Sequence, residues 1–154
     1  MGLLNLFKKP QNFFTVKEQE EIVEAIRKAE LHTSGEVRIY IESKNAMVNP
    51  LDRAGEIFFN LKMEETEHRN AVLIYIATKD HELAIFGDEG IYQAVGASYW
   101  NEAVSNIINN IDRKDLSYAL QQTILAIGKT LAEKFPYESS TDKNELPDDI
   151  VFGH

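Results

Sequence analysis

A run of seven apolar residues, AVLIYIA at positions 71–77, constrains the fold of this chain more than any other feature. The run is far too short to cross a membrane as a helix, which takes about 20 residues. A strand with one solvent-exposed face alternates apolar and polar residues, whereas a strand buried on both faces is apolar throughout. The run therefore predicts a central strand that is covered by other elements on both faces.

The segments around this run predict how the chain reaches and leaves it. Residues 36–42 alternate as a half-buried strand would, and residues 50–61 have the apolar spacing of a helix that begins at Asn49-Pro50. Strand, helix and strand in this order indicate a right-handed parallel crossover. Residues 82–86 follow a short polar turn and predict a strand that returns antiparallel to 71–77. We expect an α/β fold, a three-layer α/β/α sandwich of Rossmann-like appearance around a small mixed sheet.

The remaining segments predict further helices and the domain boundaries. Thr15 and Glu18 have the spacing of a capping box for a helix that runs to about Leu31. A helical region from Ile91 to about Ile111 is interrupted at Gly96, and a last helix spans about 116–135. We divide the chain into an N-terminal arm (1–12), one domain (13–137) and an acidic C-terminal tail (138–154), which could dock through Leu146, Ile150, Val151 and Phe152.

Composition and missing motifs exclude several function classes. The net charge of −9 leaves no basic stripe for nucleic acid, and the absence of cysteine removes disulfides and thiolate chemistry. The chain contains no nucleophile elbow, no P-loop and no zinc-protease helix motif. It also contains no signal peptide and no apolar run of membrane-spanning length, so we expect a cytoplasmic protein.

Carboxylates therefore carry the functional prediction, and they fall at two edges of the expected sheet. Asp88 and Glu89, in the segment FGDEGI (86–91), should lie near Glu36 at the edge where the parallel strands begin. Asp80 and Glu42 should lie at the opposite edge, where open α/β sheets bind ligands. The two groups cannot form one site. Ca²⁺ and Mg²⁺ prefer such oxygen ligands, so Asp88, Glu89, Glu36 and Asp80 are our metal-ligand candidates.

Simpler interpretations of the same residues stay open. Asp80 could be an ordinary turn residue, and Asp88 could be the N-cap of the helix that follows. Against a simple cap, Gly87 and Gly90 flank the two acids. Glycine permits a positive φ, which would let backbone carbonyls converge with Asp88 on one point. We expect a ligand-binding turn here.

Several segments together resemble one known family. FFTVKEQEEIVEAIRKAELHTSGEVRIYIE (13–42), RNAVLIYIATKDHELAIFGDEGI (69–91), VGASYW (95–100) and AIGKTLAEKFPY (126–137) follow one another as in the TPM domain, and NELPDDIVF (144–152) is similar to the ending of short bacterial members. The family occurs in thylakoid-lumen proteins, photosystem proteins and many bacterial proteins. The resemblance implies an α/β/α sandwich, divalent cations, notably calcium, and weak acid phosphatase activity. It also implies that Gly87, Asp88, Gly90 and Ile91 form the family's acidic turn and that Asp80 is its strand-ending acid.

Two functions follow from these observations. The first is a soluble accessory domain that binds a partner protein, for which the resemblance implies a LemA-type membrane protein in bacteria, with a cation that stabilises one loop. The alternative is a weak metal-dependent acid phosphatase that hydrolyses phosphomonoesters. In that case Arg38, Arg69 or Lys79 could bind the phosphate. The sequence singles out no catalytic residue.

Overall fold

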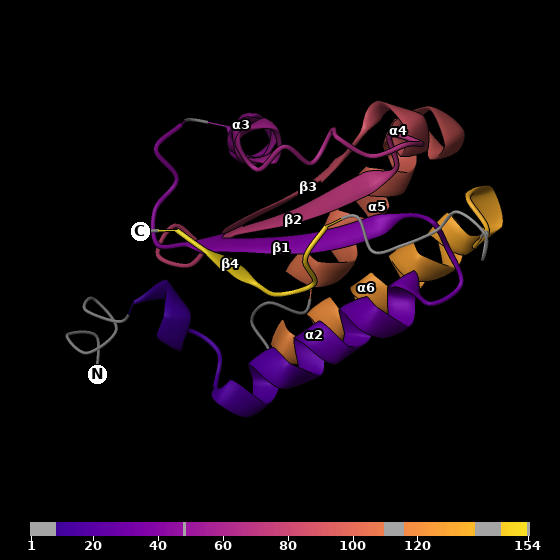
Figure 1. The fold of residues 1–154 in the computed structure, drawn as a ribbon. Coiled ribbons are helices and arrows are strands. Elements are labelled where there is room, and N and C mark those ends of the chain that lie inside the picture. The colour runs from indigo at the N-terminus through magenta and orange to yellow at the C-terminus, as the bar shows by residue number, and fades with distance from the viewer. Residues whose placement is uncertain (1–8, 48, 110–115, 138–145, 154) are drawn as a thin grey trace.

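The sheet lies between two layers of helices in the computed structural model, which describes residues 9–47, 49–109, 116–137 and 146–153 (Figure 1). Helix α3 covers one face, and α2, α5 and α6 cover the other. The predicted α/β/α sandwich is thus confirmed. Most of the predicted N-terminal arm and residues 138–145 of the tail lie outside the described residues. In chain order the elements are η1 (Pro10–Asn12), α2 (Val16–Glu30), β1 (Glu36–Glu42), α3 (Pro50–Asn60), β2 (Ala71–Ala77), β3 (Glu82–Gly87), α4 (Glu89–Val95), α5 (Ala97–Ile108), α6 (Leu116–Lys134) and β4 (Val151–Phe152).

The predicted helix starts are confirmed by their capping bonds. The Glu18 N–H donates to the Thr15 hydroxyl at 3.1 Å, and the Thr15 N–H donates to the Glu18 carboxylate at 2.9 Å, which is a full capping box for α2. The side chain of Asn49 accepts from the Leu51 N–H at 2.8 Å at the start of α3. These bonds satisfy N–H groups that a helix leaves without partners in its first turn.

The sheet has the order β3-β2-β1-β4, with β3 antiparallel and the other strands parallel. Glu36 lies opposite Ala71 at one end of the β1–β2 pair, and Glu42 lies opposite Ala77 at the other. The crossover from β1 through α3 to β2 and the antiparallel return of β3 are both confirmed. Residues that follow β3 therefore lie at the end of the sheet where β1 and β2 begin.

Every residue of β2 is buried, as the apolar run predicts. Its side chains alternate between two cores because successive residues of a strand point to opposite faces. Val72, Ile74 and Ile76 pack with α2, α5 and α6, whereas Leu73 and Tyr75 pack with α3. Both layers of helices thus depend on this one strand.

Gly96 separates α4 from α5, which confirms the predicted interruption. Its φ is 82°, a backbone conformation that residues other than glycine rarely adopt. The break lets α5 turn its apolar face toward the sheet, where Trp100 and Ile107 are buried. None of the helices within the described residues is long and apolar enough to cross a membrane.

The end of the chain forms a fourth strand that the sequence does not predict. Val151 and Phe152 pair in parallel with Tyr40 and Ile41 of β1. Ile150 and Phe152 pack against the core formed with α2, while Leu146 packs against the core formed with α3. The C-terminal segment, residues 146–153, therefore lies along the β1 edge of the sheet and carries its acids next to β1.

Candidate functional site

Asp88 lies at the end of the sheet where β1 and β2 begin, and it is almost fully buried, with 2% of its surface exposed. It is the N-cap residue of α4, and its Oδ1 accepts from the Glu89 N–H at 2.8 Å. Its two oxygens also accept from one guanidinium, from Arg69 Nε at 2.6 Å and from Arg69 Nη2 at 2.8 Å. The cap interpretation is confirmed, and the cation that the structure shows at Asp88 is Arg69. A metal at Asp88 or Glu89 stays a prediction.

The two glycines of FGDEGI serve close packing. Among the glycines of the described residues, only Gly96 has a positive φ, so the expectation of positive φ at Gly87 and Gly90 is wrong. A Cβ on Gly90 would lie 2.3 Å from the His68 carbonyl oxygen, and a Cβ on Gly87 would lie 2.5 Å from the Trp100 ring. The turn needs glycine because other groups approach its backbone too closely for any side chain.

The loop before β2 is fixed to the same turn. The Gly90 N–H donates to the Arg69 carbonyl at 2.9 Å, and the Ile91 N–H reaches the same oxygen at 3.3 Å. Arg69 itself has a φ of 51°, a strained value for a residue with a side chain. Its backbone and its side chain thus both bind the start of α4, which shows that FGDEGI joins α4 to the loop in front of β2.

Glu36 belongs to a different acidic group at this end of the sheet. Its carboxylate, together with those of Glu30 and Asp148, offers oxygens that all lie within 4.8 Å of one another. Glu30 is the last residue of α2, Glu36 is the first of β1, and Asp148 lies in the C-terminal segment. We call these three residues the acidic triad. Glu36 begins β1, whereas Asp88 directly follows β3, and β2 lies between these two strands. The two acids that were expected to lie near each other therefore belong to two separate clusters.

Burial makes the acidic triad electrostatically unusual. Only 3% of Glu36 is exposed, and Asp148 Oδ1 is buried without a hydrogen-bond partner. Burial, the hydrogen bond to Asp148 and the charge of Glu36 together raise the pKa of Glu30 from its ordinary 4.5 to about 10, although Glu30 Oε2 accepts from the Val37 N–H at 2.8 Å. Three carboxylates in such a space need a proton or a cation to offset their repulsion.

A cation of the protein lies close to the triad but faces a different acid. Burial lowers the pKa of Arg38, and the neighbouring charge of Asp149 opposes this shift. Arg38 Nε is buried and has no hydrogen-bond partner. Two consecutive acids of the C-terminal segment thus have neighbours of opposite charge: Asp149 lies beside an arginine, and Asp148 lies beside two glutamates.

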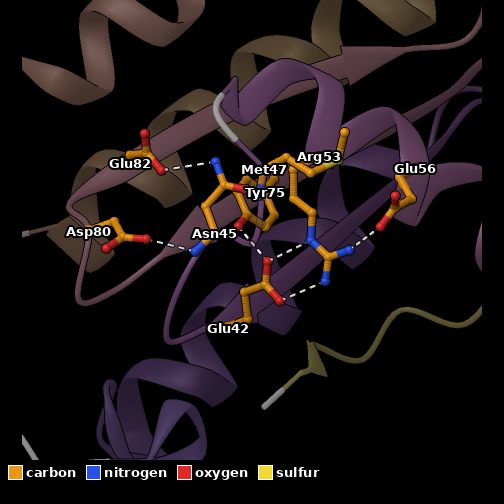
Figure 2. A network of polar contacts seen from close by, with 8 residues as sticks. All are labelled: Glu42, Asn45, Met47, Arg53, Glu56, Tyr75, Asp80 and Glu82. Carbon is orange, nitrogen blue, oxygen red and sulfur yellow. Dashed lines mark hydrogen bonds and ion pairs between the residues drawn. The ribbon is translucent and has the colours of Figure 1, made fainter.

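The opposite end of the sheet, where β1 and β2 end, holds a second polar network, which is centred on Glu42 (Figure 2). Arg53 Nε donates to Glu42 Oε2 and Arg53 Nη2 donates to Oε1, both at 2.8 Å, and the Tyr75 hydroxyl also donates to Oε2. Arg53 completes its set with an ion pair to Glu56. Burial and the bond to Glu42 raise the pKa of Tyr75. Arg53 is the counter-charge of both Glu42 and Glu56, and this set of mutual contacts indicates a structural role.

Asp80 lies next to this network and organises the loop after β1 (Figure 2). Its Oδ2 accepts from the Asn45 N–H at 2.7 Å, while Glu82 Oε1 accepts from Asn45 Nδ2 at 3.0 Å. Asn45 in turn accepts from the Met47 N–H at 2.9 Å. Asp80 is part of a turn, as the simpler interpretation holds, and a metal at Asp80 stays a prediction.

The described groups offer little for binding a phosphate. Of the three predicted candidates, Arg69 is bonded to Asp88 and Glu89, and Arg38 faces Asp149. Lys79 is exposed in the turn between β2 and β3. A groove of about 550 Å³ lies between α5 and α6, and no predicted site residue lines it.

The sequence reveals only one member of the acidic triad because its members come from three separate segments. Glu30 has the sequence context of a solvated acid in the last turn of a helix, and Asp148 that of an acid in a polar tail. The segment PDDIVF does contain a signal, since two acids stand directly before three apolar residues that can pair as an edge strand. Only the packing of that strand on β1 brings Asp148 to Glu36.

Three comparisons relate the chain to known proteins. A family model described as the TPM domain matches residues 7–130. The NMR structure of BA42 protein from the psychrophilic bacterium Bizionia argentinensis is similar, with a TM-score of 0.84 and 37% identity over 94% of this chain and 99% of that one. The N-terminal domain of cg2496 protein from Corynebacterium glutamicum shares the fold, with a TM-score of 0.61 and 10% identity over 96% and 89% of the two chains. None of the curated proteins compared with the chain matches it.

Proposed function

The chain belongs to the TPM domain family, and we propose that it is an accessory domain that binds a divalent cation at the acidic triad and a partner protein elsewhere on its surface. The observation that carries the cation site is the convergence of Glu30, Glu36 and Asp148 within 4.8 Å. Ca²⁺ and Mg²⁺ are the cations that such a set of carboxylate oxygens fits.

The surroundings of the triad support a cation rather than a purely structural cluster. Asp148 Oδ1 is buried without a hydrogen-bond partner, and Glu30 is held in a form that binds a proton tightly. A divalent cation would replace that proton and offset two of the three negative charges. By binding all three it would join the end of α2, the start of β1 and the C-terminal segment.

The test is a titration of CaCl₂ and MgCl₂ into the purified protein, followed by calorimetry and by the thermal midpoint. We expect saturable binding and a midpoint that rises with concentration, because a ligand of the native state stabilises it. Asp148→Asn removes one carboxylate from the triad and should abolish both effects. Asp80→Asn and Asp88→Asn are the matched controls at the two other acidic positions and should retain them.

Two results would contradict the cation site. One is the absence of binding by either ion at millimolar concentration. The other is binding that survives Asp148→Asn and Glu30→Gln but is lost in Asp80→Asn or Asp88→Asn. The second result would move the site to one of the acids that the sequence alone singles out.

The partner follows from the family resemblance, which implies a LemA-type membrane protein. The net charge of −9 favours a basic surface on that partner. Calorimetry with a purified LemA-type protein, with and without CaCl₂, measures this interaction directly. Binding that weakens with salt concentration would agree with a charged interface.

Phosphatase activity is the second function that the resemblance implies, and no contact in the structure favours it over the first. The guanidinium groups of Arg53 and Arg69 are bonded to carboxylates. The acidic triad contains no positive group, and its carboxylates repel a phosphomonoester unless a cation intervenes. Assays with a chromogenic phosphomonoester and each metal ion test this alternative.

A further inference from the structure

The C-terminal segment is held on β1 by very few backbone contacts. Val151 and Phe152 are its only paired strand residues within the described chain, and the Gly153 N–H donates to the Ile41 carbonyl at 2.8 Å. A two-residue strand at a sheet edge has little stability of its own. Docking of the segment therefore depends on its side chains.

Those side chains contribute in opposite directions. Ile150 and Phe152 pack against the core, and Asp149 supplies the charge next to Arg38. Asp148 instead brings a third carboxylate to Glu30 and Glu36, with its Oδ1 buried and without a hydrogen-bond partner. When neither a proton nor a cation lies among the three acids, this repulsion opposes docking, whereas a bound cation would turn the same contact into an attraction.

We infer that the C-terminal segment is a cation-controlled latch, which closes on the edge of β1 when a divalent cation joins Asp148 to Glu30 and Glu36. The inference rests on the proposed cation site and adds what binding at that site controls. Opening the latch uncovers the backbone of β1 around Tyr40 and Ile41. An uncovered strand edge is a template on which another chain can pair.

The latch has a consequence that a passive cation site lacks. Coupling between two events is reciprocal, so if the cation tightens docking of the segment, docking must strengthen cation binding by the same factor. A change that undocks the segment must therefore weaken cation binding. Gly153 offers such a change, since a Cβ there would lie 2.2 Å from the Tyr40 hydroxyl oxygen. Gly153 is not a member of the triad.

The first experiment measures hydrogen exchange of the Gly153 amide by NMR, with and without saturating CaCl₂, on the sample used for calorimetry. We expect the cation to slow exchange about tenfold, because exchange reports local opening. Asp148→Asn should remove this effect. Asp149→Asn should speed exchange up to about fivefold, the scale of an interaction between exposed charges, and should leave a response to the cation.

The second experiment measures Ca²⁺ affinity of Gly153→Ala, with Gly55→Ala as the control. Gly55 lies in α3, where a Cβ would be 3.2 Å from the end of the Phe86 ring. We expect about tenfold weaker binding in Gly153→Ala and unchanged binding in Gly55→Ala.

The outcomes separate the latch from the cation site. Calcium binding without any change in Gly153 exchange overturns the latch and leaves the proposed function standing. Unchanged affinity in Gly153→Ala, when its segment is shown by exchange to be loosened, also overturns the latch. If calcium does not bind but magnesium does, the same experiments are run with MgCl₂, and absence of binding by both ions overturns the proposed function and the latch together.

Discussion

Arg69 binds Asp88 through two hydrogen bonds of 2.6 and 2.8 Å while its own backbone is held at a φ of 51°. The pair fastens the loop in front of β2 to the start of α4. Asp88 is buried and Arg69 is about one-third exposed, with 36% of its side chain accessible. An acid that looks like a metal ligand in the sequence is thus neutralised by an arginine that stands well before it in the chain.

Asp88→Asn tests the energetic role of this pair. Asparagine still caps a helix well, so the main loss is the charge interaction with Arg69. We expect the free energy of unfolding to fall by about 1–2 kcal/mol, below the cost for a fully buried pair because water screens Arg69. Urea unfolding measures the change. Glu89→Gln, at an exposed position of the same turn, should cost less than about 0.5 kcal/mol; equal costs would show that the pair contributes nothing special.

Replacing Gly90 or Gly96 by alanine should destabilise the protein, for a different reason at each position. A Cβ on Gly90 meets the His68 and Arg69 carbonyl oxygens, whereas a Cβ on Gly96 meets nothing within 4 Å and suffers only from the positive φ. We expect a loss of about 1 kcal/mol for Gly96→Ala and clearly more for Gly90→Ala, since backbone must move. Thermal unfolding of the two variants side by side decides the order. A smaller loss at Gly90 would mean that α4 can shift away at little cost.

Tyr75→Phe and Glu42→Gln dissect the second polar network. Removing the Tyr75 hydroxyl leaves both oxygens of Glu42 bonded to Arg53, so we expect a loss of about 1 kcal/mol. Glu42→Gln leaves Arg53, whose side chain is only 17% exposed, without its main counter-charge, and should cost about 3 kcal/mol. Denaturant unfolding measures both. A Glu42→Gln protein as stable as the wild type would show that Glu56 alone can balance Arg53.

Glu30 should make the protein less stable as the pH rises. Its pKa is raised in the folded state, so between its ordinary 4.5 and about 10 the folded chain binds more protons than the unfolded chain. The stability that this proton provides is fully present below pH 4.5 and is lost as the pH approaches 10. Without divalent cations, we expect wild type to lose about 2 kcal/mol or more relative to Glu30→Gln between pH 5 and pH 8.

The control for this pH dependence is Glu24→Gln on the same helix. Glu24 is about half exposed and pairs loosely with Arg27, so this variant should keep the wild-type pH profile. Parallel profiles for wild type and Glu30→Gln would contradict the account. A saturating divalent cation should flatten the wild-type profile, because it takes the place of the proton.

The fold was largely predictable because its signals are local. The apolar run at 71–77 requires cover on both faces, Thr15 and Glu18 form their capping box within one turn, and Gly96 breaks a helix through its own backbone. Each of these signals depends on residues a few positions apart. Their order then leaves few topologies open, since parallel strands joined by a helix cross over in one hand.

The site was less predictable because it depends on contacts between distant segments. Sequence reasoning placed Asp88 and Glu36 at the same end of the sheet. It could not show that Arg69 binds the Asp88 carboxylate. Nor could it show that the Glu36 carboxylate lies close to those of Glu30 and Asp148. It also predicted that Gly87 and Gly90 are glycines because they adopt a positive φ, whereas they are needed because other groups pack directly against their backbone.

The sequence by itself determined the layers, the strand order of the β1–β3 unit and the helix boundaries, because periodicity, capping and turn residues act over a few positions. Only the tertiary structure decided which acids face an arginine and which face each other. That choice follows from the docking of the C-terminal segment on β1, which sets Asp149 beside Arg38 and Asp148 beside the two glutamates. Charge interactions depend on distance in space and on burial, and neither is written in the spacing of residues along the chain.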